Sequence, residues 1–198
     1  MAEISASVVN EFRKKTGLAL MECKKLLIEA DGDLKKAETL AKERGLKNAE
    51  LRAGRVAKAG RVEVYIHHDA KSGVLIELNC ETDFVARNDE FKQLAKDLAV
   101  HVMAANPLYV RREDVPADVV QEQKRIFMSQ VADKPANIQE KIADGKLNAW
   151  YAEIALLDQN YVKDDARSVK EVILAVNART GENISVARFA RFIVGENR

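Results

Sequence analysis

The sequence predicts an α+β protein, with a small N-terminal helical domain followed by a core in which helices cover an antiparallel sheet of about three strands. Three observations lead to this prediction. Apolar residues recur at three- and four-residue spacing up to residue 45, strict alternation begins at residue 61, and a second strand-like pattern ends the chain. The predicted domains are therefore residues 1–45 and 61–198, joined by a linker over residues 46–60.

The N-terminal domain is expected to contain three short helices. Apolar residues share a face within each helix: Val8 and Phe12, then Leu20, Cys23 and Leu27, then Leu34, Ala37, Leu40 and Ala41. Ser5 or Ser7 can cap the first helix. Residues 16–18 interrupt the pattern after it, and Gly45 is expected to end the third helix.

The linker over residues 46–60 is basic and rich in alanine. From Lys42 to Arg61 there are seven Lys or Arg and two acidic residues. This segment could bind RNA, but it lacks the interleaved aromatic residues on which bases stack. A partly helical tether is the favoured interpretation, and an RNA- or ribosome-associated binding protein is the alternative. The net charge of +1 gives little support to direct nucleic-acid binding.

The core begins with a predicted hairpin. Residues 61–67 alternate as a half-buried strand does, and residues 68–73 connect them to a second strand with Val74, Ile76, Leu78 and Cys80 on one face. Residues 183–194, at the end of the chain, are apolar enough to pair with this hairpin. Together these runs predict the three-stranded sheet.

Five helical segments are expected between the hairpin and the last strand. Asn88 can cap a helix that places Phe91, Leu94 and Leu98 on one face, and Pro107 ends it. Pro116 starts the next helix. Two shorter helical segments flank Gly145, and a final apolar stripe over residues 169–176 is closed by Gly181.

The motifs of several protein classes are missing from the sequence. It contains no phosphate-binding loop, no dinucleotide fingerprint and no nucleophile elbow. His67 and His68 are adjacent on a strand and point to opposite faces, so they do not predict a metal site. We therefore expect no enzyme, no metal and no cofactor.

The cellular setting is expected to be the cytoplasm. Cys23 and Cys80 are isolated cysteines without a C-x-x-C pair, which is typical of a reducing compartment. No run is long and apolar enough to span a membrane, and the N-terminus lacks a cationic segment followed by an apolar one. A membrane partner and a secretory signal are therefore not expected.

The candidate functional segment is NCETDFVARNDEF, residues 79–91, between the second strand and a helix. Phe84 could pack back on the sheet. However, Phe91 and Leu94 already supply apolar surface to the helix, and burying Phe84 would bring the Asp83 carboxylate with it. An exposed aromatic residue beside a carboxylate has the composition of an interface hot spot. We therefore expect a binding protein with a projecting aromatic side chain.

Three stretches of the chain resemble elongation factor Ts, the bacterial exchange factor for elongation factor Tu. They are FRKKTGLALMECKKLL, LNCETDFVARNDEF and GENISVARFARF. The resemblance implies an N-terminal domain like a ubiquitin-associated domain, followed by a core of sheet and helices. It also implies a guanine-nucleotide exchange factor that binds elongation factor Tu in its GDP-bound and nucleotide-free states.

The resemblance also assigns roles to residues. In such proteins the T-D-F-V segment inserts between helices of the Tu nucleotide-binding domain and disturbs its magnesium site. Here that segment is Thr82, Asp83, Phe84 and Val85. A second set would contact the same domain near its phosphate loop: Arg13, Leu20 and Met21. Asp83 could act by its charge or by capping a displaced helix.

The short members of this family tend to dimerise through the core. The resemblance therefore implies a homodimer, and the sheet edge formed by residues 187–194 is the expected interface. A dimeric scaffold without effect on nucleotide is a further alternative.

Overall fold

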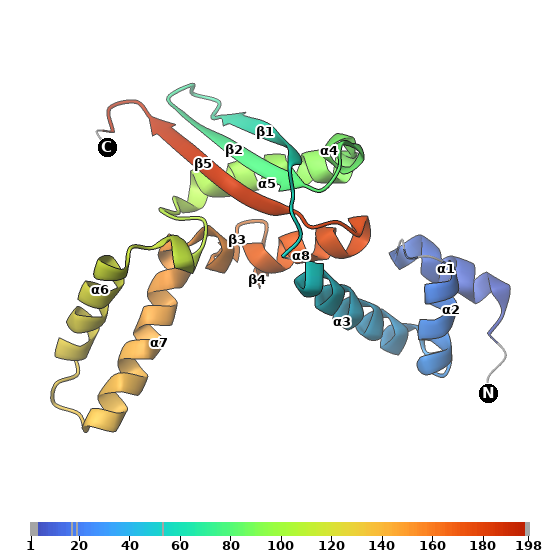
Figure 1. Cartoon of the computed structure of the whole chain (residues 1–198), viewed down its shortest axis with the longest axis horizontal. Coiled ribbons are helices and arrows are strands. Elements are labelled where there is room, and N and C mark those ends of the chain that lie inside the picture. The colour runs from blue at the N-terminus through green and yellow to red at the C-terminus, as the bar shows by residue number, and fades with distance from the viewer. Residues whose placement is uncertain (1–3, 17, 19, 53, 197–198) are drawn as a thin grey trace.

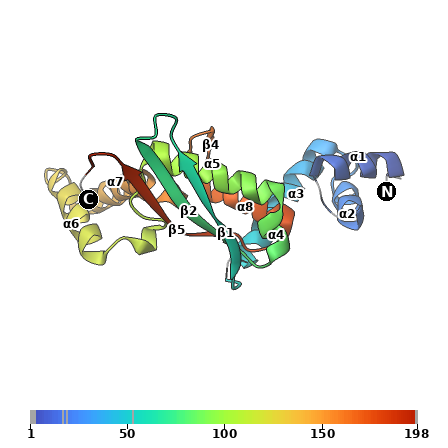
Figure 2. The same cartoon turned by 90° about the horizontal axis from the view of Figure 1, so that it is seen from above.

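The computed structural model describes residues 4–16, 18, 20–52 and 54–196. Gly17, which lies in the predicted break after the first helix, is outside the described residues. The molecule is elongated, with a helical unit at one end, a sheet with its helices in the middle, and a helical hairpin at the other end (Figures 1 and 2).

The N-terminal unit consists of three helices: α1 (Ala6–Thr16), α2 (Leu20–Glu29) and α3 (Leu34–Arg52). Its small core contains Val9, Phe12, Cys23, Leu26, Leu27, Ala30 and Ala37. The turn between α2 and α3 places Asp31 and Gly32 in the left-handed region, with φ of 52° and 84°. Asp33 then caps α3, because its Oδ1 accepts hydrogen bonds from the backbone N–H groups of residues 35 and 36.

The prediction that Gly45 ends the third helix is wrong, because α3 continues to Arg52. A glycine inside a helix costs only about 1 kcal/mol relative to alanine, and tertiary packing overrides that cost here. Gly45 lies against α8, where a Cβ added to it would be 3.0 Å from the Cβ of Ala178. The first half of the basic segment is therefore helical.

The predicted three-stranded antiparallel sheet is confirmed, in the order β1-β2-β5. Its strands are β1 (Ala59–Ile66), β2 (Ser72–Cys80) and β5 (Ser185–Ile193). Helix α5 (Asp89–Ala105) covers one face of the sheet (Figure 2). The core between them includes Val74, Ile76, Leu78, Cys80, Phe91, Leu94 and Leu98. The alternation in the sequence thus identified the covered face correctly.

The opposite face of the sheet, called here the outer sheet face, carries exposed apolar side chains. They are Val62, Val64, Ile66, Leu75 and Phe192. They share one face because Val64 lies opposite Leu75 and Leu75 lies opposite Ala190.

The next two helices form a hairpin that projects from the core (Figure 1). They are α6 (Ala117–Ser129) and α7 (Ala136–Ile154). Pro116 is at the N-cap of α6, as predicted. The prediction of two segments around Gly145 is wrong, because α7 is a single helix that contains this glycine. A Cβ added to Gly145 would meet no atom within 4 Å, so no tertiary contact interrupts the helix there.

Helix α8 (Val169–Thr180) joins the sheet to the N-terminal unit. Ser168 and Glu171 form a capping box at its start, and Gly181, with φ of 75°, ends it as predicted. The remaining elements are short: η1 (Arg112–Asp114), η2 (Leu156–Asp158), β3 (Asn160–Tyr161) and β4 (Asp164–Ser168). In the described part of the chain, no helix has both the length and the hydropathy needed to cross a membrane.

His101 is buried where α5 meets the segment after α7. Its Nε2 lies 3.0 Å from Oε1 of Gln159, and its Nδ1 accepts a hydrogen bond of 3.2 Å from the backbone N–H of Val162. These partners fit a neutral ring with its proton on Nε2. Burial lowers the pKa of His101, and the hydrogen bond to Gln159 opposes that change only partly.

Acid is expected to destabilise the protein once the pH falls below about 6.5, the ordinary pKa of histidine. Below this pH the histidine binds a proton in the unfolded chain but not in the folded chain, where its pKa is lower. Protonation therefore favours unfolding, and the stability present above this pH is lost as the pH falls. Urea unfolding between pH 7.5 and 5.5 measures the effect. His101→Gln should flatten the pH dependence, whereas His68→Gln, at the exposed end of the hairpin, should leave it unchanged. An unaltered slope in His101→Gln would contradict this account.

Candidate functional site

The segment Thr82–Val85, called here the TDFV turn, lies at the start of a one-turn helix. The sequence predicted only a connection between a strand and a helix here, and within it the structure has helix α4 (Asp83–Arg87). Thr82 is its N-cap, with the backbone N–H of Val85 donating to Oγ1 of Thr82 at 3.5 Å. Asn88 has an extended backbone between α4 and α5, and it caps α5 as predicted. This bend separates the turn from the long helix.

Phe84 projects into solvent from this turn. Its side chain is 88% exposed, the highest fraction of any large apolar residue that the structure describes. Val85 and Ala86 are partly buried against the sheet and α5. Because these two residues face inward, Phe84 and Asp83 face outward. The alternative that Phe84 folds back on the core is therefore wrong.

The charged groups of the turn are also exposed. Asp83 and Arg87 form an ion pair of 3.6 Å across one helical turn, and both side chains are at least 75% exposed. An exposed pair of this kind contributes little to stability. It leaves the Asp83 carboxylate accessible to a binding partner.

Cys80 lies two residues before the TDFV turn and points inward. Its Sγ donates a hydrogen bond of 3.2 Å to the backbone carbonyl of Thr82. Burial, followed by the charge of Glu182, raises the pKa of the Cys80 thiol to about 11. The thiol is therefore protonated at neutral pH, which fits a structural cysteine rather than a nucleophile.

Two carboxylates, those of Glu182 and Glu81, fix the segment before the TDFV turn, and neither of them was identified from the sequence. Glu182, in the connection between α8 and β5, accepts hydrogen bonds from the backbone N–H groups of Glu81 and Thr82, at 3.0 Å each. It also accepts a bond of 2.5 Å from Oγ1 of Thr82. Glu81 in turn accepts a hydrogen bond of 2.7 Å from the backbone N–H of Asn183. No local spacing could reveal this pairing, because the two glutamates are 101 residues apart.

The second set of predicted residues lies on the N-terminal unit. Arg13 is exposed on α1, while Leu20 and Met21 open α2 with exposed fractions of 46% and 66%. Two exposed apolar side chains at the start of a helix fit a binding surface. Figure 1 shows α1 and α2 standing away from α4, so the fold presents the two sets on separate bodies.

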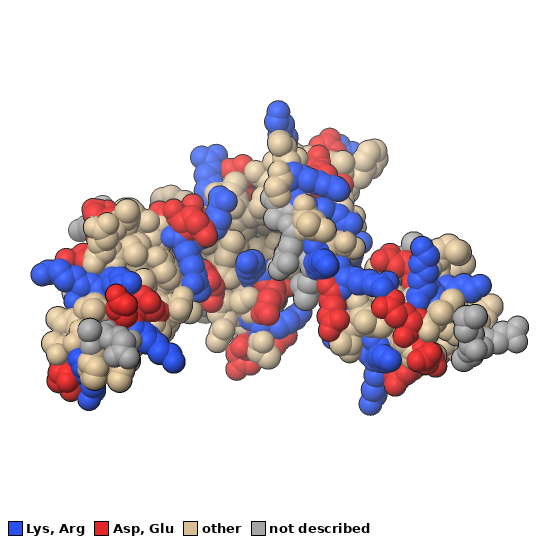
Figure 3. Space-filling model, turned by 60° about the horizontal axis from the view of Figure 1, so that its bottom comes forward, with Lys and Arg blue, Asp and Glu red and all other residues tan. Residues whose placement is uncertain are grey.

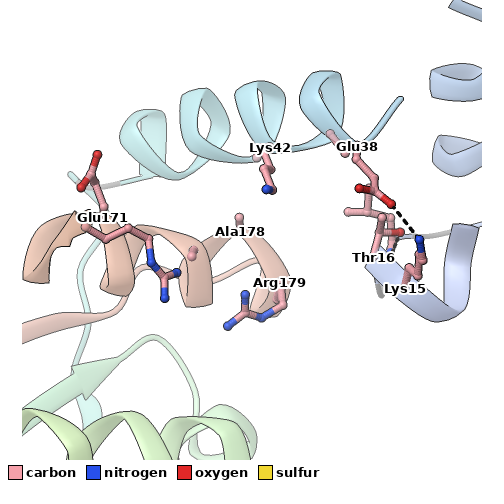
Figure 4. A pocket seen from close by; sticks show the side chains of 12 residues that line it. Lys15, Thr16, Glu38, Lys42, Glu171, Ala178 and Arg179 are labelled. Atoms are coloured by element: carbon pink, nitrogen blue, oxygen red, sulfur yellow. Dashed lines mark hydrogen bonds and ion pairs between the residues drawn. The ribbon is translucent and has the colours of Figure 1, made fainter. Parts of the chain in front are cut away.

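A cleft of about 610 Å³ lies between the N-terminal unit and α8. Figure 4 shows Glu38 and Lys42 of α3 on one side and Glu171 and Arg179 of α8 on the other. Lys15 of α1 reaches Glu38 at 3.2 Å and ties the bundle together next to the cleft. The contact of Gly45 with Ala178 sets how closely α3 approaches α8. It therefore sets where Arg13, Leu20 and Met21 lie relative to the core.

The chemistry available at the TDFV turn is that of binding. Among the residues described, no group of three or more His, Cys, Asp or Glu side chains is placed to hold a metal ion. The face shown in Figure 3 intersperses both signs of charge, with no large area of one sign. The turn offers an aromatic ring and a carboxylate on a fixed support, which suits insertion into a protein partner.

Comparison with known proteins identifies the family of the chain. The family model described as "Elongation factor TS" matches residues 3–196. The chain is 49% identical to elongation factor Ts of Thermotoga petrophila, over 98% of both chains. It is 50% identical to the proteins of that name from Geobacter sulfurreducens and Anaeromyxobacter dehalogenans. Those matches cover 98% and 99% of this chain, respectively, and 90% of each relative.

The close approach of α3 to α8 can be tested with two glycine substitutions. Gly145→Ala is expected to stabilise the protein by about 1 kcal/mol, because the helix gains propensity and the site is open. Gly45→Ala should lose this gain, because its new methyl group would be 3.0 Å from Ala178 and two helices would have to separate. Chemical denaturation measures the change in the free energy of unfolding of both variants. Equal stabilisation by the two substitutions would contradict the assigned contact.

Proposed function

The chain belongs to the elongation factor Ts family, a family of translation elongation factors, and from this premise we propose that it is the guanine-nucleotide exchange factor for elongation factor Tu. It binds the GDP-bound form of Tu, promotes GDP release and stays bound to the nucleotide-free form until GTP enters. The observation that supports this most directly is the exposure of Phe84 on the TDFV turn.

The proposed mechanism is insertion of the TDFV turn between helices of the Tu nucleotide-binding domain. Magnesium links the nucleotide phosphates to a protein through oxygen ligands, so disturbing its site weakens GDP binding. This magnesium belongs to the partner. Binding of factor and nucleotide are then coupled, and each must weaken the other by the same factor. Asp83 brings a carboxylate to the same region, where it acts by its charge or by capping a displaced helix.

Burial of Phe84 alone supplies too little free energy for rapid GDP release, so a second contact with Tu is needed. Burying Phe84 in the partner supplies about 1.5–3 kcal/mol, which corresponds to roughly ten- to hundredfold in an equilibrium constant. We propose that Arg13, Leu20 and Met21 add a second disturbance near the phosphate loop of Tu. Their location on a separate body suits this role, because the two contacts can then reach different parts of the partner.

This function requires no covalent chemistry by the chain and no cofactor of its own. The protonated thiol of Cys80 fits that proposal. A role in translation elongation places the protein in the cytoplasm, without a need for direct contact with nucleic acid or membrane.

We further propose that the protein forms a homodimer through its core. The sequence pointed to the edge formed by residues 187–194, and β5 is an edge strand. The outer sheet face supports an alternative surface, because Val62, Val64 and Phe192 are between 53% and 64% exposed on it. Two copies related by a twofold axis can cover this face with the same face of the partner. We favour the face over the edge because it buries more apolar surface.

Phe84→Ala is expected to slow the factor-stimulated release of GDP from Tu roughly ten- to hundredfold, because the inserted aromatic surface is lost. Release of a fluorescent GDP from Tu at fixed magnesium concentration measures this. Complex formation should persist in weakened form through the N-terminal unit.

Leu108→Ala is the matched control for this experiment. It removes another exposed apolar side chain, 58% exposed, at the opposite end of α5. Release with Phe84→Ala at the parent rate would remove the basis of the insertion mechanism. A parent protein that leaves GDP release unchanged but binds RNA in a salt-dependent way would favour the alternative based on the basic segment.

Val64→Lys is expected to shift the protein from dimer to monomer, because it places a charge in the proposed interface. Sedimentation velocity over a range of concentrations measures the change, with Leu108→Lys as the control. A dimer that withstands Val64→Lys would redirect attention to the edge of β5.

A further inference from the structure

Glu182 contacts the TDFV turn without being part of it. Its Oε2 accepts the backbone N–H groups of Glu81 and Thr82 at 3.0 Å, and its Oε1 accepts Oγ1–H of Thr82 at 2.5 Å. One carboxylate thus satisfies three donors immediately before the first turn of α4. Hydrogen bonds to a charged acceptor are shorter and roughly twice as strong as those between neutral groups.

Glu81 makes a reciprocal contact, because its own carboxylate accepts a backbone N–H from the segment that carries Glu182. Its Oε1 accepts the backbone N–H of Asn183 at 2.7 Å, and its Oε2 lies 3.6 Å from the guanidinium of Arg55. The side chain of Asn183 donates to the backbone carbonyl of Arg55 at 2.7 Å. Three segments are therefore joined at one point: the connection from β2 to α4, the connection from α8 to β5, and the segment that follows α3.

We infer that Glu182 is a positioning residue for nucleotide exchange, which holds the TDFV turn in the orientation that its partner requires. This inference rests on the proposed function. Glu182 acts through Thr82 and Glu81.

The physical reason is that α4 is too short to be stable as a helix without tertiary contacts. It has five residues, and an isolated helix of that length does not form in water. Its N-cap bond from Val85 to Thr82 is long, at 3.5 Å. The orientation of Phe84 therefore depends on tertiary contacts, namely the inward packing of Val85 and the hydrogen bonds to Glu182. An ordered turn enters its partner without the loss of freedom that a mobile turn would suffer on binding.

Glu171 provides a matched control in the same chain. Its carboxylate also accepts a backbone N–H and a hydroxyl, those of Ser168, at 2.7 and 3.0 Å. It belongs to the capping box of α8, so it makes a local contact, and it lies at the other end of α8 from Glu182. The pair Glu182→Gln and Glu171→Gln therefore separates support of the turn from general support of the fold.

The test uses the full-length protein and Tu loaded with fluorescent GDP. At saturating factor, Glu182→Gln is expected to lower the maximal rate of GDP release about tenfold, and Glu182→Ala by more. The factor concentration for half-maximal rate should change much less, because the N-terminal unit and the rest of the core still bind. Glu171→Gln should retain the parent rate at temperatures well below its unfolding transition.

A second readout requires no partner. In a Cys23→Ala background, the reaction of Cys80 with Ellman's reagent reports opening of the turn, because the Cys80 thiol donates to the carbonyl of Thr82. The charge of Glu182 also raises the pKa of the Cys80 thiol, so the rate is measured over a range of pH and compared per thiolate. On that basis Glu182→Gln should accelerate the reaction several-fold, and Glu171→Gln should not. Circular dichroism confirms that each variant is folded.

The outcomes separate the two proposals. If the parent protein accelerates GDP release and Glu182→Gln matches it, the positioning role is wrong and the exchange function stands. If Glu182→Gln and Glu171→Gln slow release equally, the effect is one of general stability and the positioning role is again wrong. A folded parent protein that does not accelerate release would remove the exchange function itself, together with the role inferred for Glu182.

Discussion

Burial of one sheet face against α5 is the packing interaction on which the rest of the structure depends. It requires every second residue of β2 to face the helix, so the strand ends with Cys80 pointing inward. The chain must then pass from the end of this strand to the start of the helix that covers it. Residues 81–88 make that connection, and they do so at the rim of the core. The exposed position of Phe84 thus follows from the packing behind it.

The sequence predicted the elements whose apolar period is long and regular. The strands, α5 and the cap at Asn88 follow from alternation, helical spacing and capping chemistry, all of which act over a few residues. The exposure of Phe84 was also predictable, because burying it would have carried Asp83 with it. The continuation of α3 through Gly45 was not, since the local sequence does not reveal that Gly45 packs against Ala178 far along the chain. The pairing of Glu81 with Glu182 escaped prediction for the same reason, and β3 and β4 are too short to show a period.

The two candidate contact sets differ in how the fold supports them. The TDFV turn is tied to the sheet by packing and by charge-assisted hydrogen bonds. Arg13, Leu20 and Met21 belong to a small bundle that reaches the core along α3, with a cleft beside it. The fold thus places the two contact sets by different means: hydrogen bonds orient the TDFV turn, whereas packing of α3 against α8 positions the bundle. Arg55 follows α3 and pairs with Glu81, so the segment that carries the bundle meets the connection that carries the TDFV turn at this ion pair.

The hairpin of α6 and α7 has a consequence for how the chain can change during evolution. Of its described side chains, Val131 and Ala143 are the buried ones, and its two helices pack on each other. Residues could therefore be added or removed in whole helical turns near its tip without disturbing the sheet or the TDFV turn. Length differences between homologous chains are expected to concentrate in this hairpin, while the spacing between β2 and α5 is held constant.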